Sequence, residues 1–151
     1  MSIIIGDQAP EFSLPDQNGN TFSLKDFIGQ SNILLYFYPK DEIPGCIAEA
    51  CGFRDNIVDF EGYNCKVVGI SKDSVNSHSK FARHYNLPFT LLSDKKNVVR
   101  NLYGVESKIL GLLPGRKTYL INKQGTITHI FDYQFKAKKH VIDTLKALSN
   151  E

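Results

Sequence analysis

The chain has 151 residues and a formal net charge of +2, and its 42% hydrophobic and 23% charged residues are typical of a globular protein. This composition excludes a disordered chain, and the small net charge gives no reason to expect a nucleic acid as partner. The length predicts a single domain over residues 1–151, large enough to bury a core without structural metal ions or disulfide bonds.

The amino terminus, MSIIIGDQAP, has neither the basic residues nor the long apolar run of a signal peptide. No stretch approaches the roughly 18 apolar residues of a membrane span. We therefore expect a cytoplasmic protein without a membrane partner. The chain has three cysteines, too few for the disulfide framework of a small secreted domain. In a reducing compartment, two nearby cysteines indicate catalysis or metal binding.

The first third of the chain predicts a hairpin and then a buried strand. Asn18-Gly19 lies between two small apolar segments, which predicts a hairpin within residues 11–27. Residues 32–38, NILLYFY, are apolar at nearly every position, as expected for a strand that is buried on both faces.

From Cys46 the apolar and small residues recur at helical spacing, and Gly62 predicts the end of one continuous helix. The remaining elements are a strand at 66–71, helices at 76–85 and 97–104, a strand at 89–94, a hairpin at 117–133 and an amphipathic helix at 137–150. Strands interleaved with helices predict an α/β protein with one layered sheet. Its parallel part should run through 32–38 and 66–71, with an antiparallel edge from 117–133.

Cys46 falls beyond the carboxyl end of the buried strand and in the first turn of the helix. Ligand sites form at that edge of an open α/β sheet, and a helix amino terminus stabilises a thiolate. We therefore expect a reactive Cys46 whose pKa lies below its ordinary value. Pro44 has no N–H group, and Gly45 allows the backbone to approach a ligand closely. The alternative is that Cys46 is a small buried apolar residue.

Cys51 follows Cys46 by five positions. On an intact α-helix the two Cα atoms would lie roughly 8.6 Å apart. A disulfide bond needs about 4.4–6.8 Å between Cα atoms. If the two cysteines are a redox pair, the first turns of the helix must therefore unwind in the oxidised form.

Several motifs together resemble the peroxiredoxins. They are GDQAPEFSLPDQNG near the start, YFYPK leading into PGC with the spacing C-x4-C, FRD at 53–55, VVGIS and LLSD. The cysteine spacing is similar to that of the Q-type group, also called bacterioferritin-comigratory proteins. The resemblance implies a thioredoxin fold with an N-terminal β-hairpin extension. It also implies thiol-dependent reduction of hydrogen peroxide and organic hydroperoxides, with no cofactor.

The resemblance assigns roles to five residues. Cys46 would attack the peroxide and become a sulfenic acid, and Cys51 would condense with it to an intramolecular disulfide. Arg116, in GRKTYLI, would stabilise the thiolate and the leaving oxygen. Glu49 would orient that arginine, and Pro39 would shield the sulfur. Thioredoxin or a similar dithiol donor would recycle the protein, which we expect to be a monomer.

Two positions depart from the family pattern. Ile43 stands where the motif has a threonine or serine hydroxyl beside the sulfur, and Ile47 stands where a threonine is common. Isoleucine can neither donate nor accept a hydrogen bond. Loss of one preorganised polar group commonly costs about 10²–10³ in rate. The alternative function is therefore a catalytically impaired peroxiredoxin fold that acts as a redox sensor or binding module.

The remaining candidates favour no further chemistry. Cys65 is expected to be a filler at the start of a strand. The four histidines form no ligand-like pair, and C-x4-C lacks the second pair of a zinc ribbon, so we expect no metal site. These histidines are His78, His84, His129 and His140.

Overall fold

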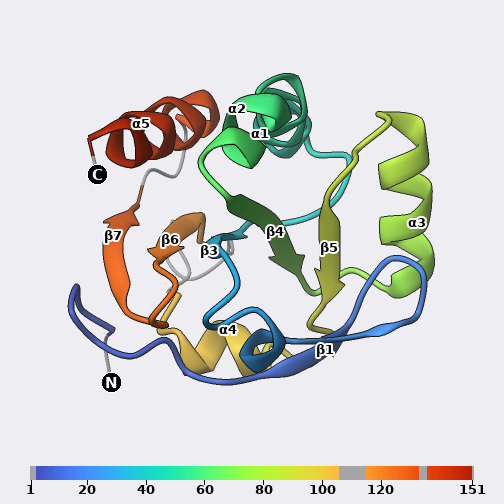
Figure 1. Ribbon diagram of the computed structural model, residues 1–151. Helices are drawn as coiled ribbons and strands as arrows, with labels where there is room; N and C mark the ends of the chain where they lie inside the picture. The colour runs from blue at the N-terminus through green and yellow to red at the C-terminus, as the bar shows by residue number, and fades with distance from the viewer. Residues whose placement is uncertain (1–2, 106–114, 133–135, 151) are drawn as a thin grey trace.

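The computed structural model describes residues 3–105, 115–132 and 136–150 (Figure 1). Its centre is a five-stranded sheet in the order β5-β4-β3-β6-β7. The strands are β3 (Asn32–Phe37), β4 (Cys65–Ser71), β5 (Thr90–Ser93), β6 (Lys117–Ile121) and β7 (Ile127–Phe131). β3, β4 and β5 are parallel to one another, whereas β6 pairs antiparallel with β3 and β7 antiparallel with β6.

The central strand β3 is buried on both faces, as its continuous apolar sequence predicts. Ile33 and Phe37 belong to the hydrophobic cluster on one face of the sheet, and Leu34 and Tyr36 belong to the cluster on the other. This alternation follows from the two-residue period of a strand. β3 ends at Phe37, where the chain leaves the sheet.

Helices cover the sheet on both faces (Figure 1). They are α1 (Pro44–Asp55), α2 (Ile57–Gly62), α3 (Val75–His84), α4 (Val98–Leu102) and α5 (Ala137–Ser149). Side chains of α1, α2, α3 and α5 build one cluster. The other cluster receives α4 and the N-terminal hairpin, which consists of β1 (Ser13–Pro15) and β2 (Thr21–Ser23), followed by the 3-10 helix η1 (Leu24–Asp26).

The prediction of one continuous helix from Cys46 to Gly62 is wrong, because the chain breaks at Asn56 into α1 and α2. Asn56 has φ −112° and ψ 14°, which are not helical, and its side-chain amide donates to the carbonyl oxygen of Gly52 at 2.7 Å. An asparagine that bonds a nearby carbonyl competes with the helical hydrogen-bond ladder. The break leaves both Cys46 and Cys51 inside α1.

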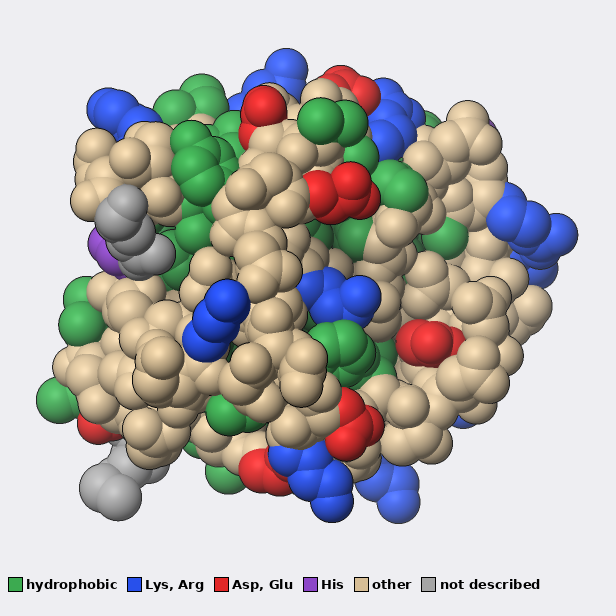
Figure 2. Space-filling view, viewed as in Figure 1, with side chains coloured by type: hydrophobic (Ala, Val, Ile, Leu, Met, Phe, Trp, Pro, Cys, Tyr) green, Lys and Arg blue, Asp and Glu red, His purple; other side chains and the backbone are tan. Residues whose placement is uncertain are grey.

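The other predicted elements are present with shifts of one or two residues at their ends. None of the described helices is long and apolar enough to cross a membrane. Figure 2 shows basic and acidic side chains mixed over the visible face, without a large field of one sign.

Candidate active site

The structure places Cys46 in the first turn of α1, beyond the carboxyl end of β3. Pro44 is the first helical residue, a position where its missing N–H group is not needed. Ile43 precedes it in an extended conformation and gives the helix no side-chain cap. The Cys46 side chain is buried, with a relative exposure of 1%.

Arg116 and Glu49 meet Cys46 behind this turn. β6 pairs with β3 so that Lys117 lies opposite Phe37, and this register brings Arg116 beside the end of β3. Arg116 Nη2 donates to Cys46 Sγ at 3.4 Å, and Arg116 Nη1 donates to Glu49 Oε1. Glu49 lies three residues after Cys46 and therefore on the same side of α1. We call Cys46, Glu49 and Arg116 the reaction cluster.

Three further predicted residues lie in the segment that leads to Cys46. Pro39 is buried in the loop between β3 and α1, and Pro44 is exposed. Gly45 is half-buried, and a Cβ atom there would lie 3.2 Å from Arg116 Nη2. The close neighbour at this position is therefore the guanidinium group of Arg116, which an added Cβ atom would displace slightly.

The expected lowering of the Cys46 pKa is wrong for this closed site, because burial raises the pKa of the thiol above its ordinary value. Sequence reasoning missed this because it located the helix terminus but not the depth of the sulfur. Arg116 and a hydrogen bond from the backbone of Lys40 both lower the pKa of Cys46. Burial also raises the pKa of Glu49 to about 7, against the opposing effect of Arg116.

Glu49 has further buried neighbours that the sequence gave no reason to select. Its Oε2 atom has no hydrogen-bond partner among the described residues and lies 3.9 Å from His140 Nδ1. That nitrogen lies 2.8 Å from Thr118 Oγ1. All three side chains are inaccessible to solvent. The Glu49 carboxylate thus binds the charged guanidinium group of Arg116 through Oε1 and makes only a longer contact with His140 through Oε2.

Among the described residues no disulfide bond joins Cys51 to Cys46, and Cys65 is in no disulfide bond either. Cys51 is half-buried and lines a cavity of about 390 Å³ between α1 and α5, together with Gly52, Val141 and Ile142. Because α1 is an intact helix over both cysteines, their Cα atoms are separated by roughly 8.6 Å. The thiols cannot bond in this conformation.

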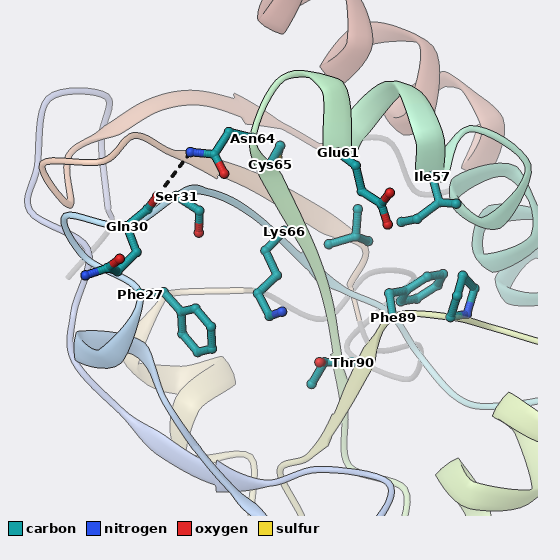
Figure 3. Close-up of a pocket in the computed structure, with 12 residues that line it drawn as sticks. Phe27, Gln30, Ser31, Ile57, Glu61, Asn64, Cys65, Lys66, Phe89 and Thr90 are labelled. Carbon is teal, nitrogen blue, oxygen red and sulfur yellow. Dashed lines mark hydrogen bonds between the residues drawn. The ribbon is translucent and has the colours of Figure 1, made fainter.

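Cys65 lies at the other end of the sheet. Figure 3 shows it in the wall of a cavity of about 410 Å³ whose lining includes Lys66, Phe89 and Thr90. Cys65 begins β4 and Thr90 begins β5, so this cavity lies at the amino ends of parallel strands, opposite to Cys46. None of the predicted site residues lines it.

Sequence reasoning missed a second polar group, which surrounds Asp41 in the β3–α1 loop. We call it the anchor cluster; its side chains are those of Tyr38, Asp41, Ser71, Asp73, Ser77 and His78. Within it, the ligand atoms of Asp41, Asp73 and His78 all lie within 4.8 Å of one another, a spacing that suits a metal ion. The one signal in the sequence was that His78 lies three residues before buried Phe81, on the apolar side of its helix.

Comparison with known proteins places the chain in a family. Residues 5–130 match the AhpC/TSA family. The chloroplastic peroxiredoxin Q of Triticum aestivum is 48% identical over 96% of this chain and 66% of its own length. That of Sedum lineare is also 48% identical, over 96% of this chain and 77% of its own length. The chain thus spans about two thirds to three quarters of these relatives.

Solved structures agree. Peroxidoxin BcpB from Mycobacterium tuberculosis has a TM-score of 0.89 and 33% identity, covering 97% of this chain and 96% of its own. PrxQ from Xylella fastidiosa has a TM-score of 0.90 and 29% identity, covering 99% of this chain and 98% of its own. These matches confirm the expected thioredoxin fold and, at the level of the family, a thiol-dependent peroxidase.

One expectation is overturned. The predicted cytoplasmic location conflicts with the curated relatives, which are chloroplastic proteins. That prediction depended on the first residues and on the absence of a long apolar stretch, neither of which bears on the chemistry of the site. Fold, cysteine spacing and both comparisons agree, by contrast, on what kind of protein this is: the chain belongs to the AhpC/TSA family and, within it, to the Q-type peroxiredoxins.

Proposed function

We propose that the protein reduces hydrogen peroxide and organic hydroperoxides with Cys46 as the attacking thiol. The observation that carries this assignment is the hydrogen bond from Arg116 to Cys46 Sγ, made inside a buried cluster. A fixed positive charge at the sulfur stabilises the thiolate and the oxygen that leaves, and it does so more strongly in a site that excludes water.

In the first step the Cys46 thiolate attacks one oxygen of the peroxide. An S–O bond forms and the O–O bond breaks, and its electron pair goes to the second oxygen, which takes a proton and leaves as water or an alcohol. Cys46 is oxidised to a sulfenic acid and the peroxide is reduced. Glu49 orients Arg116, Gly45 lets the guanidinium group approach, and Pro39 shields the sulfur. Ile43 and Pro44, which precede Cys46 in the chain, border the path by which the peroxide reaches the sulfur.

In the second step the Cys51 thiol attacks the Cys46 sulfenic acid. An S–S bond forms, the S–O bond breaks and water leaves. Because the two cysteines lie in one helix, the first turns of α1 must unwind before the sulfur atoms can meet. Peroxide treatment should therefore lower the helical far-UV circular dichroism of the wild-type protein but not of Cys51→Ser.

We further propose that residues 1–151 act as one domain and as a monomer. The disulfide forms between residues of one helix, so this chemistry needs no second copy. A dithiol protein such as thioredoxin would restore both thiols by attacking the sulfur of half-buried Cys51. Light scattering during size-exclusion chromatography tests the oligomeric state, and a stable dimer would contradict the proposal.

Peroxide consumption coupled to NADPH, thioredoxin reductase and thioredoxin tests the cysteine roles. Cys46→Ser should abolish turnover. Cys51→Ser should react once with peroxide and then stall, because no intramolecular disulfide can form. Cys65→Ser is the control and should keep wild-type turnover. Turnover that survives in Cys46→Ser, or that is lost in Cys65→Ser, would overturn the assignment.

Two observations favour a second candidate, a redox sensor on the same fold. Ile43 supplies no hydroxyl to the reaction, and burial raises the pKa of Cys46. Free-thiol counts after one equivalent of peroxide, compared with steady-state turnover, separate the two functions. A sensor would lose Cys46 and Cys51 thiols but turn over slowly, whereas a peroxidase would do both rapidly.

A further inference from the structure

We propose that His78, acting through Asp41, is a positioning residue for Cys46. It holds the β3–α1 loop, which leads directly into the turn of α1 that carries Cys46. The inference goes beyond the proposed function because it assigns a role to a buried histidine on a different helix. It rests on the proposed role of Cys46 as the reacting thiol.

Asp41 is the centre of the arrangement. Its Oδ1 atom accepts a hydrogen bond from the Tyr38 hydroxyl at 2.7 Å. Its Oδ2 atom accepts from the Ser77 hydroxyl at 2.8 Å and lies 2.7 Å from His78 Nδ1. The Asp41 side chain is 2% exposed and that of His78 is 0% exposed, so these contacts are shielded from water. Hydrogen bonds to a buried carboxylate are stronger than bonds between neutral groups.

His78 ties this loop to the sheet. Its Nε2 atom lies 2.9 Å from the carbonyl oxygen of Leu92 in β5. A carbonyl oxygen can only accept, so Nε2 carries a hydrogen, and a further proton, on Nδ1 or on Asp41 Oδ2, makes the hydrogen bond between His78 and Asp41. The imidazole therefore bridges an edge strand of the parallel sheet and a loop residue that lies 37 positions away from it in the sequence.

A second contact fixes the backbone of the same residue. The N–H group of Asp41 donates to Asp73 Oδ2 at 2.9 Å, and the Ser71 hydroxyl donates to the same oxygen. Asp41 is thus held by its side chain, through Ser77 and His78 of α3, and by its backbone, through Asp73 in the segment after β4. Its backbone has little freedom to rotate.

This restraint reaches Cys46 through the adjacent peptide. Lys40 precedes Asp41 directly, and the hydrogen bond from the Lys40 backbone to the sulfur lowers the pKa of Cys46. On the other side Glu42 adopts φ 66°, a left-handed conformation that non-glycine residues rarely take. Strained conformations persist where the surrounding structure determines them, and the anchor cluster supplies that constraint. Since Ile43 offers no hydroxyl, the bond from Lys40 gains weight in this chain.

The same residues do not make a persuasive metal site. The carboxylate oxygens of Asp41 and Asp73 already accept hydrogen bonds from three hydroxyl groups and from the backbone N–H of Asp41. A cation at their centre would have to displace these donors and separate His78 from Asp41. A satisfied hydrogen-bond network accounts for the buried charges without an ion.

The test uses His78→Leu in a background of Cys51→Ser and Cys65→Ser, where Cys46 is the one thiol. Ultraviolet absorbance of the thiolate gives the pKa of Cys46, and stopped-flow mixing gives its rate constant with hydrogen peroxide. We expect the pKa to rise by about one unit and the rate constant at neutral pH to fall about tenfold, the loss of one hydrogen bond to a charged group. His78→Gln, whose amide can still donate to Asp41, should recover part of both effects.

His129→Leu, a histidine of β7, is the matched control and should leave the Cys46 pKa unchanged. A folded His78→Leu protein with the control pKa, whatever its melting temperature, would overturn the proposal. If His78→Leu does not fold, Ser77→Ala and Tyr38→Phe each remove one bond to Asp41, and unchanged pKa values in both would also overturn it. Alkylation by iodoacetamide reports the same pKa without peroxide, so failure of the peroxidase reaction remains a separate result.

Discussion

The protein buries two polar clusters, the anchor cluster around Asp41 and the reaction cluster around Cys46, whose central residues lie five positions apart in the sequence. They differ in how completely their polar atoms are hydrogen-bonded. In the anchor cluster every side-chain oxygen and nitrogen of Asp41 and His78 has a hydrogen-bond partner at 2.7–2.9 Å. In the reaction cluster one carboxylate oxygen of Glu49 has none, and two acidic groups, Cys46 and Glu49, share the guanidinium group of Arg116.

The difference separates a structural role from a reactive one. Burial raises the pKa of both Cys46 and Glu49, because a negative charge on either group is less stable away from water. A site with one cation between two acids can redistribute its protons when the thiol reacts. Substitutions in the reaction cluster should therefore alter the chemistry directly, and those in the anchor cluster should alter the position of the loop that leads to Cys46.

The largest effect should come from Arg116→Ala. Removal of the guanidinium group takes away the charge that opposes burial, so the pKa of Cys46 should rise further and the rate constant with hydrogen peroxide should fall by about 10²–10³. Stopped-flow mixing with hydrogen peroxide over a range of pH gives both the rate constant and the pKa of Cys46. Arg83→Ala, at the exposed end of α3, is the control, and equal rates in the two variants would exclude Arg116 from the reaction.

Ile43 tests whether the reaction cluster lacks a hydrogen-bond donor. Ile43→Thr places a hydroxyl at the start of α1, where it can reach the peroxide and also cap the helix. We expect the rate constant to increase about tenfold or more. Ile43→Val has the shape of threonine without the hydroxyl and should leave the rate near the wild-type value. A similar gain in both variants would mean that side-chain volume, not the hydroxyl, limits the reaction.

The raised pKa of Glu49 in the reaction cluster should make the stability of the fold depend on pH. Its pKa rises from an ordinary value of 4.5 to about 7 in the folded protein, so the folded state binds the proton more tightly than the unfolded chain. This group therefore stabilises the fold below about pH 4.5 and loses that contribution as the pH rises to about 7, by about 1–3 kcal/mol. Urea unfolding of wild type and Glu49→Gln over this range measures it. The difference between the two proteins should depend on pH, and a constant difference would contradict the assignment.

Some of this organisation could be predicted from the sequence. The apolar run at 32–38 specified a strand buried on both faces, and Pro44-Gly45 placed Cys46 at a helix start. Such features depend on neighbouring residues. The break at Asn56 depends on one side-chain hydrogen bond, and the sign of the Cys46 pKa shift depends on tertiary burial.

The anchor cluster could not be predicted from the sequence for a related reason. The bond between Asp41 and His78 joins residues 37 positions apart, and no local pattern marks either partner. Their meeting depends on the parallel pairing of β3, β4 and β5, which brings the loop after β3 beside α3. Periodicity predicts elements, but the contacts between their ends follow only from the register of the sheet.

Gly45 should give the smallest effect, and it tests how closely the reaction cluster is packed. A Cβ atom at this position would lie 3.2 Å from Arg116 Nη2, so Gly45→Ala should displace the guanidinium group by a few tenths of an ångström. We expect the rate constant to fall about two- to fivefold, because the hydrogen bond to Cys46 lengthens without being lost. Gly62→Ala is the matched control, since a Cβ atom there meets no atom within 4 Å and the residue ends α2. Stopped-flow rates for the two alanine variants decide the matter. A larger loss in Gly62→Ala would show that the kinetics follow stability rather than the position of Arg116, and the contrast between a reactive and a saturated cluster would then lose its basis.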